Sequence, residues 1–214
     1  MWPAHCRHLR DGASHHGAML GIRRATLDDL PGAYRVCLLT GDAGEDASGQ
    51  FRDPDLLGHV YVGPYIVGEP ALALVVADED GVAGYCLAAR DTRAFADWAE
   101  REWWPSLRAR YPRRAESGPD AEIIELMHDP PVVEETILER YPAHLHLDLL
   151  ERARGRGIAR QLVERQLDQL SEVGLRACHL VVAASNANAI GFYDHLGWRV
   201  LEQGDDGWVM GITW

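Results

Sequence analysis

The chain has 214 residues, of which 47% are hydrophobic and 25% are charged. These values are ordinary for a soluble globular protein, and the length suits one domain with an insertion or a terminal extension. The formal net charge of −12 argues against a general nucleic-acid binder, which needs an excess of basic surface. It is compatible with a cationic acceptor such as an amine, although acidity that only keeps the protein soluble is the alternative explanation.

The cysteines and the apolar segments bear on the cellular compartment of the protein. No apolar run is long enough to span a bilayer, and the N-terminus lacks the apolar core of a signal peptide. The four cysteines, Cys6, Cys37, Cys86 and Cys178, lie far apart and form no C-x-x-C pair. Cys86 and Cys178 fall in predicted strands, where reduced, buried thiols are expected. The sequence therefore predicts a cytoplasmic protein without a membrane partner.

Residues 1–18 are polar, rich in Gly and His, and lack helical or strand periodicity. This composition predicts a disordered extension. Its histidines have donors that suit a metal, but disorder is the favoured interpretation; they are His5, His8, His15 and His16. A folded pattern begins directly after Met19, so we expect a single domain over residues 19–214.

The first half of this domain predicts a strand, a helix, a loop and a hairpin. Thr26 is a suitable N-cap residue, and Pro31 is tolerated in a first helical turn. Residues 56–67 show no clear periodicity. The predicted elements, in chain order, are a strand at 21–25, a helix from 26 to 39, an acidic loop at 41–54, and hairpin strands at 71–77 and 82–89 around a turn at 78–81.

The stretch 91–142 is expected to be a helical insertion, with later helices at 123–128 and 132–140. Aromatic residues recur on one face of its first helix, and core packing is the usual explanation for such a stripe. A wall of a substrate pocket is the alternative for Trp103, Trp104 and Tyr111.

The second half begins with a strand at 143–150 that alternates polar and apolar residues, so His144, His146 and Asp148 share one face. A loop with two glycines and an amphipathic helix follow, and Gly174 closes that helix as a C-cap. The remaining elements are a strand at 178–183, a short helix ending at His195, and strands at 198–201 and 208–212.

Residues 147–160 combine the end of an apolar strand, a tight loop and the first turn of a helix. Such a junction presents unpaired backbone N–H groups and the positive end of a helix dipole, which together suit a phosphate. Gly155 and Gly157 let the backbone approach the anion closely. Three arginines add positive charge there: Arg154, Arg156 and Arg160.

Two motifs in this half resemble those of a known family. Arg154-Gly155-Arg156-Gly157-Ile158-Ala159 resembles motif A of the GNAT acetyltransferases, Arg/Gln-x-x-Gly-x-Gly/Ala, at every defined position. Residues 186–198 resemble motif B, with an Asn, an Ala-Ile pair, an aromatic-Tyr pair and Leu-Gly-aromatic in order. A dinucleotide fingerprint fits less well, because it needs a third glycine where Arg160 stands.

A closer resemblance covers residues 20–214. The strands at 84–89 and 146–150, with the helical insertion between them, resemble the acetyltransferase-like domain at the C-terminus of O-GlcNAcase and its bacterial stand-alone relatives. The eukaryotic fusion domains have degenerate Gly loops, whereas this chain keeps the loop intact. The resemblance implies an α/β GNAT fold: a mixed central sheet, helices on both faces, a splay between two parallel strands, and the insertion between the third and fourth strands.

The resemblance also implies a binding site for acetyl-CoA in the splay, between the strands ending near Leu150 and Ala183. Backbone N–H groups of the Gly loop, from Gly155 to Arg160, would hold the pyrophosphate. The backbone near Leu149 and Leu150 would pair with the pantetheine arm and polarise the thioester carbonyl. The full implied set is Leu149, Leu150, Arg154, Gly155, Arg156, Gly157, Ile158, Ala159, Arg160, Asn186 and Tyr193.

Catalytic roles follow from the same resemblance. Tyr193 matches the motif B tyrosine that donates a proton to the departing CoA thiolate, and packing beneath the cofactor is its alternative role. The amine must lose a proton to a base or a water chain. His146 and Asp148 are the main candidates for that base, with bracing of the splay as the alternative, and His144 and Asp91 are further candidates.

Together these features predict an acetyl-CoA-dependent N-acetyltransferase that acts by direct transfer to an amine on a small molecule or peptide. No cysteine lies beside the motifs, which favours direct attack over a covalent enzyme intermediate. The alternative is a pseudo-acetyltransferase module that binds acetyl-CoA or a peptide with little or no catalysis. No metal or nucleic-acid partner is expected, and a homodimer is left open.

Overall fold

The computed structural model describes residues 19–113 and 117–214. The expected extension at 1–18, with Cys6 and its histidines, lies outside the described residues. Within the described ranges, no helix is both long and apolar enough to cross a membrane.

A seven-stranded mixed sheet forms the centre of the fold, in the order β1-β2-β3-β4-β5-β7-β6. The pair β4–β5 is parallel, and the other neighbouring strands are antiparallel. The strands are β1 (Gly21–Arg24), β2 (Ala73–Asp78), β3 (Gly81–Ala89), β4 (Ala143–Leu149), β5 (Ala177–Ala183), β6 (Arg199–Gln203) and β7 (Gly207–Thr213). The expected α/β fold and the β2–β3 hairpin are confirmed.

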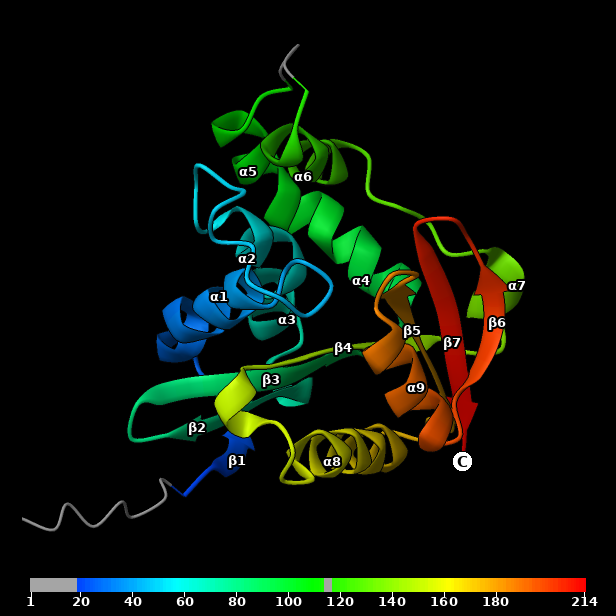
Figure 1. Cartoon of the computed structure of the whole chain (residues 1–214). Coiled ribbons are helices and arrows are strands. Elements are labelled where there is room, and N and C mark those ends of the chain that lie inside the picture. The colour runs from blue at the N-terminus through cyan, green and yellow to red at the C-terminus, as the bar shows by residue number, and fades with distance from the viewer. Residues whose placement is uncertain (1–18, 114–116) are drawn as a thin grey trace, which may run out of the picture.

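Helices cover both faces of this sheet, as Figure 1 shows. One face carries α1 (Leu30–Leu39), α2 (Leu56–Tyr61), α3 (Gly63–Gly68) and the insertion, which consists of α4 (Thr92–Trp98), a π-helical turn (Ala99–Trp103), α5 (Trp104–Arg110), α6 (Pro119–His128) and α7 (Glu135–Leu138). The other face carries α8 (Ile158–Glu172) and α9 (Ala187–His195). The insertion lies between the third and fourth strands, as expected.

Apolar residues on the two faces form separate cores. Leu145 and Leu149 of β4 pack with α8, α9 and the fully buried Trp198. Tyr85 and Leu87 of β3 pack instead with α1, α2 and α3. Because neighbouring residues of a strand point to opposite faces, the polar residues between the β4 leucines face the same helices as Tyr85. The alternation therefore places the polar face of β4 under α1–α3.

Several predicted boundaries shift for identifiable reasons. The apolar run at 71–77 begins as a helical turn, Pro70–Leu72, so β2 starts at Ala73; Pro70 has no N–H to donate to a sheet. The segment without periodicity forms α2 and α3, which meet at Gly63. The predicted helix at 132–140 is wrong in length, because α7 spans only Glu135–Leu138 after two prolines.

The aromatic residues of the insertion are core residues. Trp104 and Tyr111 are buried with Leu56 and Met127 in a third apolar cluster, against which Trp103 also packs. The core-packing interpretation is therefore confirmed, and the alternative of a pocket wall is not supported. Asp91 caps α4 by accepting a hydrogen bond from Ala94 N at 3.0 Å, so this further candidate for the base has a structural role.

A carboxylate ties β1 to the start of α1. Asp29 is 7% exposed, and its Oδ1 accepts from Arg23 Nη2 at 2.6 Å while its Oδ2 accepts from Thr26 N at 2.8 Å. The hydrogen bond from Arg23 is the main cause that lowers the pKa of Asp29 to about 2. The ionised form is thus favoured in the folded protein.

We expect acid to weaken this link. Because the folded pKa lies below the unfolded one, the link contributes stability above about pH 4, and the contribution is lost as the pH falls through about 2. Asp29→Asn should lower the free energy of unfolding at pH 7 by on the order of 1 kcal/mol, since half-exposed Arg23 is screened by solvent. Urea denaturation at pH 2 to 7 measures this, with exposed Asp28→Asn as control. Equal acid dependence in both variants would contradict the role of Asp29.

Candidate functional site

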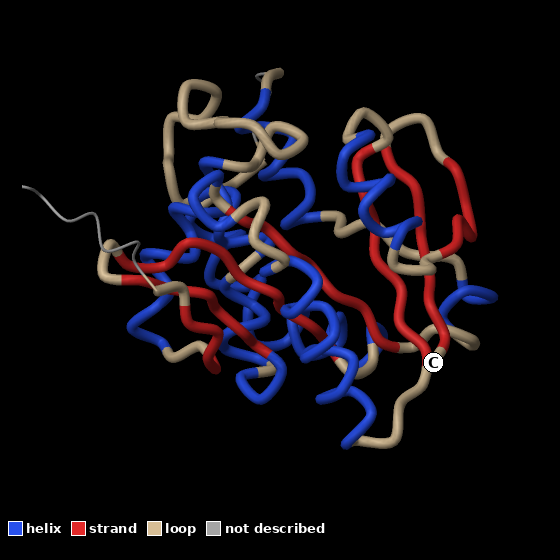
Figure 2. Tube along the Cα trace, turned by 60° about the horizontal axis from the view of Figure 1, so that its bottom comes forward, coloured by secondary structure: helices blue, strands red, loops and turns tan. Residues whose placement is uncertain are grey.

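The strands β4 and β5 separate at the middle of the sheet. They pair at Ala143 with Cys178 and at His144 with His179, and no further pair follows within the described residues. From there β4 continues to Leu149 and β5 to Ala183, and Figure 2 shows the two halves of the sheet diverging. This is the expected splay between the two parallel strands.

The edge of β4 offers backbone groups to this gap. Leu150 N donates to Ala83 O of β3 at 2.8 Å, and backbone groups of alternate residues in an antiparallel pair point in opposite directions. Leu147 and Leu149 therefore direct their N–H groups toward β5. The Leu149 carbonyl accepts from Arg154 Nε at 2.9 Å. The N–H of Leu149 is thus directed into the gap, whereas that of Leu150 is already used.

The loop between β4 and α8 holds a run of backbone N–H groups without acceptors. Gly155 and Gly157 have φ of 73° and 71°, in the left-handed region that favours glycine. None of the hydrogen bonds found in the described chain uses the N–H groups of residues 155–160, and the first helical one joins Gln161 N to Gly157 O at 3.1 Å. A Cβ on Gly155 would meet nothing within 4 Å. An open run of donors at a helix N-terminus fits a diphosphate.

The arginines of this loop differ in their surroundings. Arg154 Nε donates to Leu149 O, and its Nη2 donates to Gly44 O at 2.7 Å. Arg160 pairs with Glu164 at 3.5 Å on the surface of α8, and Arg156 is exposed. Arg154 therefore braces the loop, while Arg156 and Arg160 leave positive charge at its surface.

Three segments converge at the open end of the splay. Asn186 caps α9, where its Oδ1 accepts from Ala189 N at 3.0 Å. A Cβ on Gly44 would lie 3.6 Å from Asn186 Nδ2 and 3.9 Å from Arg154 Nη2. The predicted acidic loop, the Gly loop and the start of α9 thus meet where a ligand would enter.

Tyr193 lies on the α8–α9 side of the sheet. It is 5% exposed, and its ring packs edge-on against Trp198 with centroids 5.4 Å apart. Burial raises the pKa of Tyr193 well above its usual value. Its hydroxyl forms no hydrogen bond with a described residue, and the hydroxyl oxygen is not fully buried. A protonated, unpaired phenol of this kind can act as a proton donor.

His146 and Asp148 lie together on the opposite face. Asp148 Oδ2 is 3.1 Å from His146 Nε2 and 2.5 Å from Tyr85 Oη, which donates to it. The side chains of His146 and Asp148 are 29% and 22% exposed. Both are thus open to a small molecule, as a proton acceptor must be.

His144 is not in this group, although it shares the face. Its Nε2 lies 2.8 Å from Tyr65 Oη and its Nδ1 lies 2.8 Å from Thr92 Oγ1. Burial lowers the pKa of His144 to about 3. With both nitrogens engaged and the neutral form favoured, His144 is a structural residue and not a base.

Three residues of the site have no role predicted from the sequence: Tyr85, Tyr61 and Gly44. Tyr85 is fully buried and lies opposite Asp148 in the register of β3 and β4. Tyr61 of α2 stacks on His146 with centroids 5.7 Å apart. A polar tyrosine in the otherwise apolar β3 run was the available signal for Tyr85, but its partner depends on the strand register.

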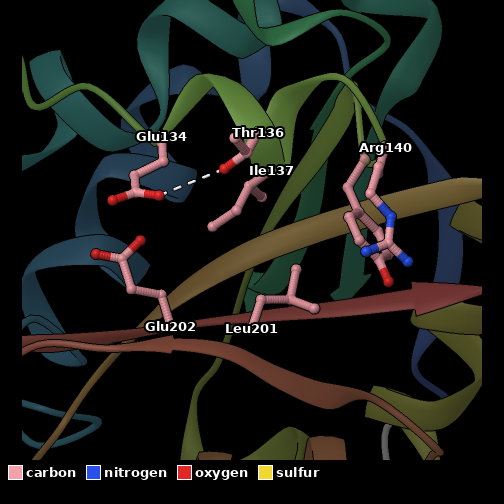
Figure 3. Close-up of a pocket in the computed structure, with 7 residues that line it drawn as sticks. Glu134, Thr136, Ile137, Arg140, Leu201 and Glu202 are labelled. Atoms are coloured by element: carbon pink, nitrogen blue, oxygen red, sulfur yellow. Dashed lines mark hydrogen bonds between the residues drawn. The ribbon is translucent and has the colours of Figure 1, made fainter.

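A separate cavity of about 280 Å³ lies between α7 and β6 (Figure 3). Glu134, Thr136, Ile137, Arg140, Tyr141, Leu201 and Glu202 line it, and none of them belongs to the predicted site. Across residues 19–113 and 117–214, no group of three or more His, Cys, Asp or Glu side chains is arranged to hold a metal ion.

Comparison with known proteins identifies relatives. The model of the acetyltransferase (GNAT) family matches residues 45–198. The chain is 27% identical over 173 residues to Protein O-GlcNAcase from Rattus norvegicus and from Mus musculus, over 79% of this chain. It spans only 19% of the length of these relatives.

Solved structures agree with the family match. The crystal structure of SsHAT superposes with a TM-score of 0.83 and 34% identity, covering 91% of this chain and 98% of that one. The structure of yncA, a putative acetyltransferase from Salmonella typhimurium with its cofactor acetyl-CoA, has a TM-score of 0.52 at 15% identity over 91% and 93% of the chains, and shows the fold alone. The match over most of the chain establishes that it belongs to the acetyltransferase (GNAT) family.

Proposed function

We propose that this chain is an acetyl-CoA-dependent N-acetyltransferase that transfers the acetyl group directly to an amine on a small molecule or peptide. The observation that carries the proposal is the open run of N–H groups at residues 155–160, placed at the end of the β4–β5 gap. A diphosphate bound there would direct the rest of an extended ligand along the unpaired edge of β4. The acetyl-CoA bound to yncA supports this choice of ligand.

Bound acetyl-CoA would supply the activated acetyl group, and the chain would supply the donors around it. The N–H groups from Gly155 to Arg160 would hold the diphosphate, and the N–H of Leu149 would face the thioester carbonyl and stabilise its developing charge. Asn186 would contact the cofactor arm from the start of α9.

The candidate acid and base lie on opposite faces of the sheet. Tyr193 belongs to the core under α8 and α9, whereas His146 and Asp148 face Tyr85 and α1–α3. The gap between β4 and β5 would join the two faces. An amine that enters from the α1–α3 side would lose its proton there, and the leaving sulfur would gain one from Tyr193.

The acceptor would approach past the acidic loop at 41–54, since Gly44 lies at the open end of the gap. Asp42 and Glu45 in that loop would attract a protonated amine. We further propose that residues 19–214 act as one cytoplasmic domain.

Acetyl-CoA binding tests this proposal directly. Because a ligand that binds only the folded state stabilises it by about 2.7 kcal/mol at 100 times Kd, we expect a clear rise in Tm with acetyl-CoA and a matching heat in calorimetry. A thiol-release screen of amines and peptides should then identify an acceptor. Absence of binding would overturn the proposal, and binding without CoA release for any acceptor would favour the pseudo-acetyltransferase module.

A further inference from the structure

Three polar groups converge between β3, β4 and α2. Tyr85 Oη, Asp148 Oδ2 and His146 Nε2 form a triangle with sides of 2.5, 3.1 and 3.2 Å. Tyr85 and Asp148 are register partners on adjacent strands, so the sheet itself holds them together. The positions of two of the three groups are therefore set by the strand register of the sheet.

The available protons fix the direction of each hydrogen bond. Tyr85 has one hydroxyl proton and donates it to Asp148 Oδ2. His146 Nε2 then faces two oxygens whose lone pairs need a donor, at 3.1 Å and 3.2 Å. The arrangement is satisfied when Nε2 carries a proton, because an unprotonated Nε2 would set a lone pair against the carboxylate. The lone pair of His146 therefore lies on Nδ1.

Nδ1 of His146 is open. It forms no hydrogen bond with any residue of the described ranges, and it is not fully buried. The groups that face the ring are Tyr61 from α2, Tyr85 from β3, and Asp148 and His144 from β4. Cys37 of α1 lies close to Tyr85 and Asp148, on the side of α1.

Tyr85 is suited to hold this arrangement over a wide pH range. It is fully buried, and burial, with Asp148 adding, raises its pKa well above the usual value. The hydroxyl therefore stays protonated and keeps donating to Asp148. Asp148 in turn can stabilise the positive charge that His146 gains when Nδ1 accepts a proton.

We propose that His146 is the base of the transfer through Nδ1, that Asp148 orients it, and that Tyr85 is a positioning residue for both. This inference rests on the proposed function. In the step, the protonated amine first releases one proton to water, the neutral nitrogen then bonds to the acetyl carbon, and its second proton goes to His146 Nδ1. The carbon–sulfur bond breaks, and the sulfur takes the phenolic proton of Tyr193. Exchange with water restores both side chains.

The tautomer can be measured without any ligand. Long-range ¹H–¹⁵N correlation spectra of the full chain at pH 8, assigned with His146→Gln, should show the proton of His146 on Nε2. Asp148→Ala should mix the two tautomers. A His146 ring that is protonated on Nδ1 in the wild-type protein would overturn the inference while leaving the proposed function intact.

Chemical rescue tests the same roles during turnover, with the amine found in the thiol-release screen. His146→Ala should lower kcat/KM for the amine by about 100-fold with unchanged Kd for acetyl-CoA, and added imidazole should restore part of the rate. Asp148→Ala should not respond to imidazole. Full activity of His146→Ala would overturn the inference alone, whereas no transfer by the wild-type protein would overturn the proposed function as well.

A matched pair of tyrosines separates positioning from packing. Tyr85→Phe should lower kcat and mix the two tautomers of His146 in the ¹H–¹⁵N spectra, because His146 loses part of its orientation. Tyr65→Phe removes a similar hydroxyl, 2.8 Å from His144 Nε2, and should leave both unchanged. Equal effects of the two variants, or none from Tyr85→Phe at unchanged Tm, would contradict the role of Tyr85.

Discussion

Replacing Tyr193 by phenylalanine is expected to lower kcat by about 100-fold or more, with little change in the affinity for acetyl-CoA. The substitution removes only the hydroxyl, which bonds to no described residue, so the ring keeps its edge-on contact with Trp198. The free energy of unfolding should therefore change by no more than about 1 kcal/mol. Steady-state thiol release, calorimetry and thermal unfolding measure the three quantities.

Tyr193→Phe distinguishes proton donation from packing. If Tyr193 only supports the cofactor, phenylalanine fills the same space and turnover stays at the wild-type level. If it is the acid, the loss appears in kcat and not in binding. Since burial keeps the pKa of Tyr193 well above its usual value, the wild-type rate should not fall at moderately alkaline pH through ionisation of this residue.

The second large effect is expected at the Gly loop. Gly157→Asp sets a Cβ in a left-handed conformation, at φ 71°, and a carboxylate beside the expected diphosphate. Left-handed strain of about 1–2 kcal/mol lowers the stability of the fold, and like-charge repulsion of several kcal/mol opposes the binding of the diphosphate. The affinity for acetyl-CoA should fall by at least about 100-fold, since each 1.4 kcal/mol is tenfold. Calorimetry measures it.

Gly174→Asp is the matched control for this change. Gly174 also has positive φ, 85°, and a Cβ there meets nothing within 4 Å, but it lies just past the other end of α8. Both variants should lose similar stability, while only Gly157→Asp should lose affinity. Equal affinities in the two variants would show that the loop does not bind the anion.

Local patterns predicted the parts of the fold that depend on neighbouring residues. Alternation placed His146 and Asp148 on one face of β4, and the glycines marked the loop before α8. Each of these follows from residues a few positions apart. The helix expected at 132–140 failed because the prolines before it leave only a short α7.

Contacts between distant segments were not predictable in this way. Arg154 resembles a phosphate ligand in sequence, but its guanidinium is held by Leu149 O and by Gly44 O, 110 positions away. The backbone near Leu149 and Leu150 was expected at the cofactor, and within it Leu150 N donates to Ala83 O of β3. The pairing of Tyr85 with Asp148 depends on the β3–β4 register, which no local pattern specifies.

The guanidinium of Arg154 connects two parts of the site. One of its nitrogens holds the strand that would face the donor, and another holds the loop that would face the acceptor. A ligand that moves the carbonyl of Leu149 or of Gly44 must strain or break the hydrogen bond that joins Arg154 to the other carbonyl. The affinities for donor and acceptor would then be linked. The linkage is reciprocal, because each ligand changes the affinity for the other by the same factor.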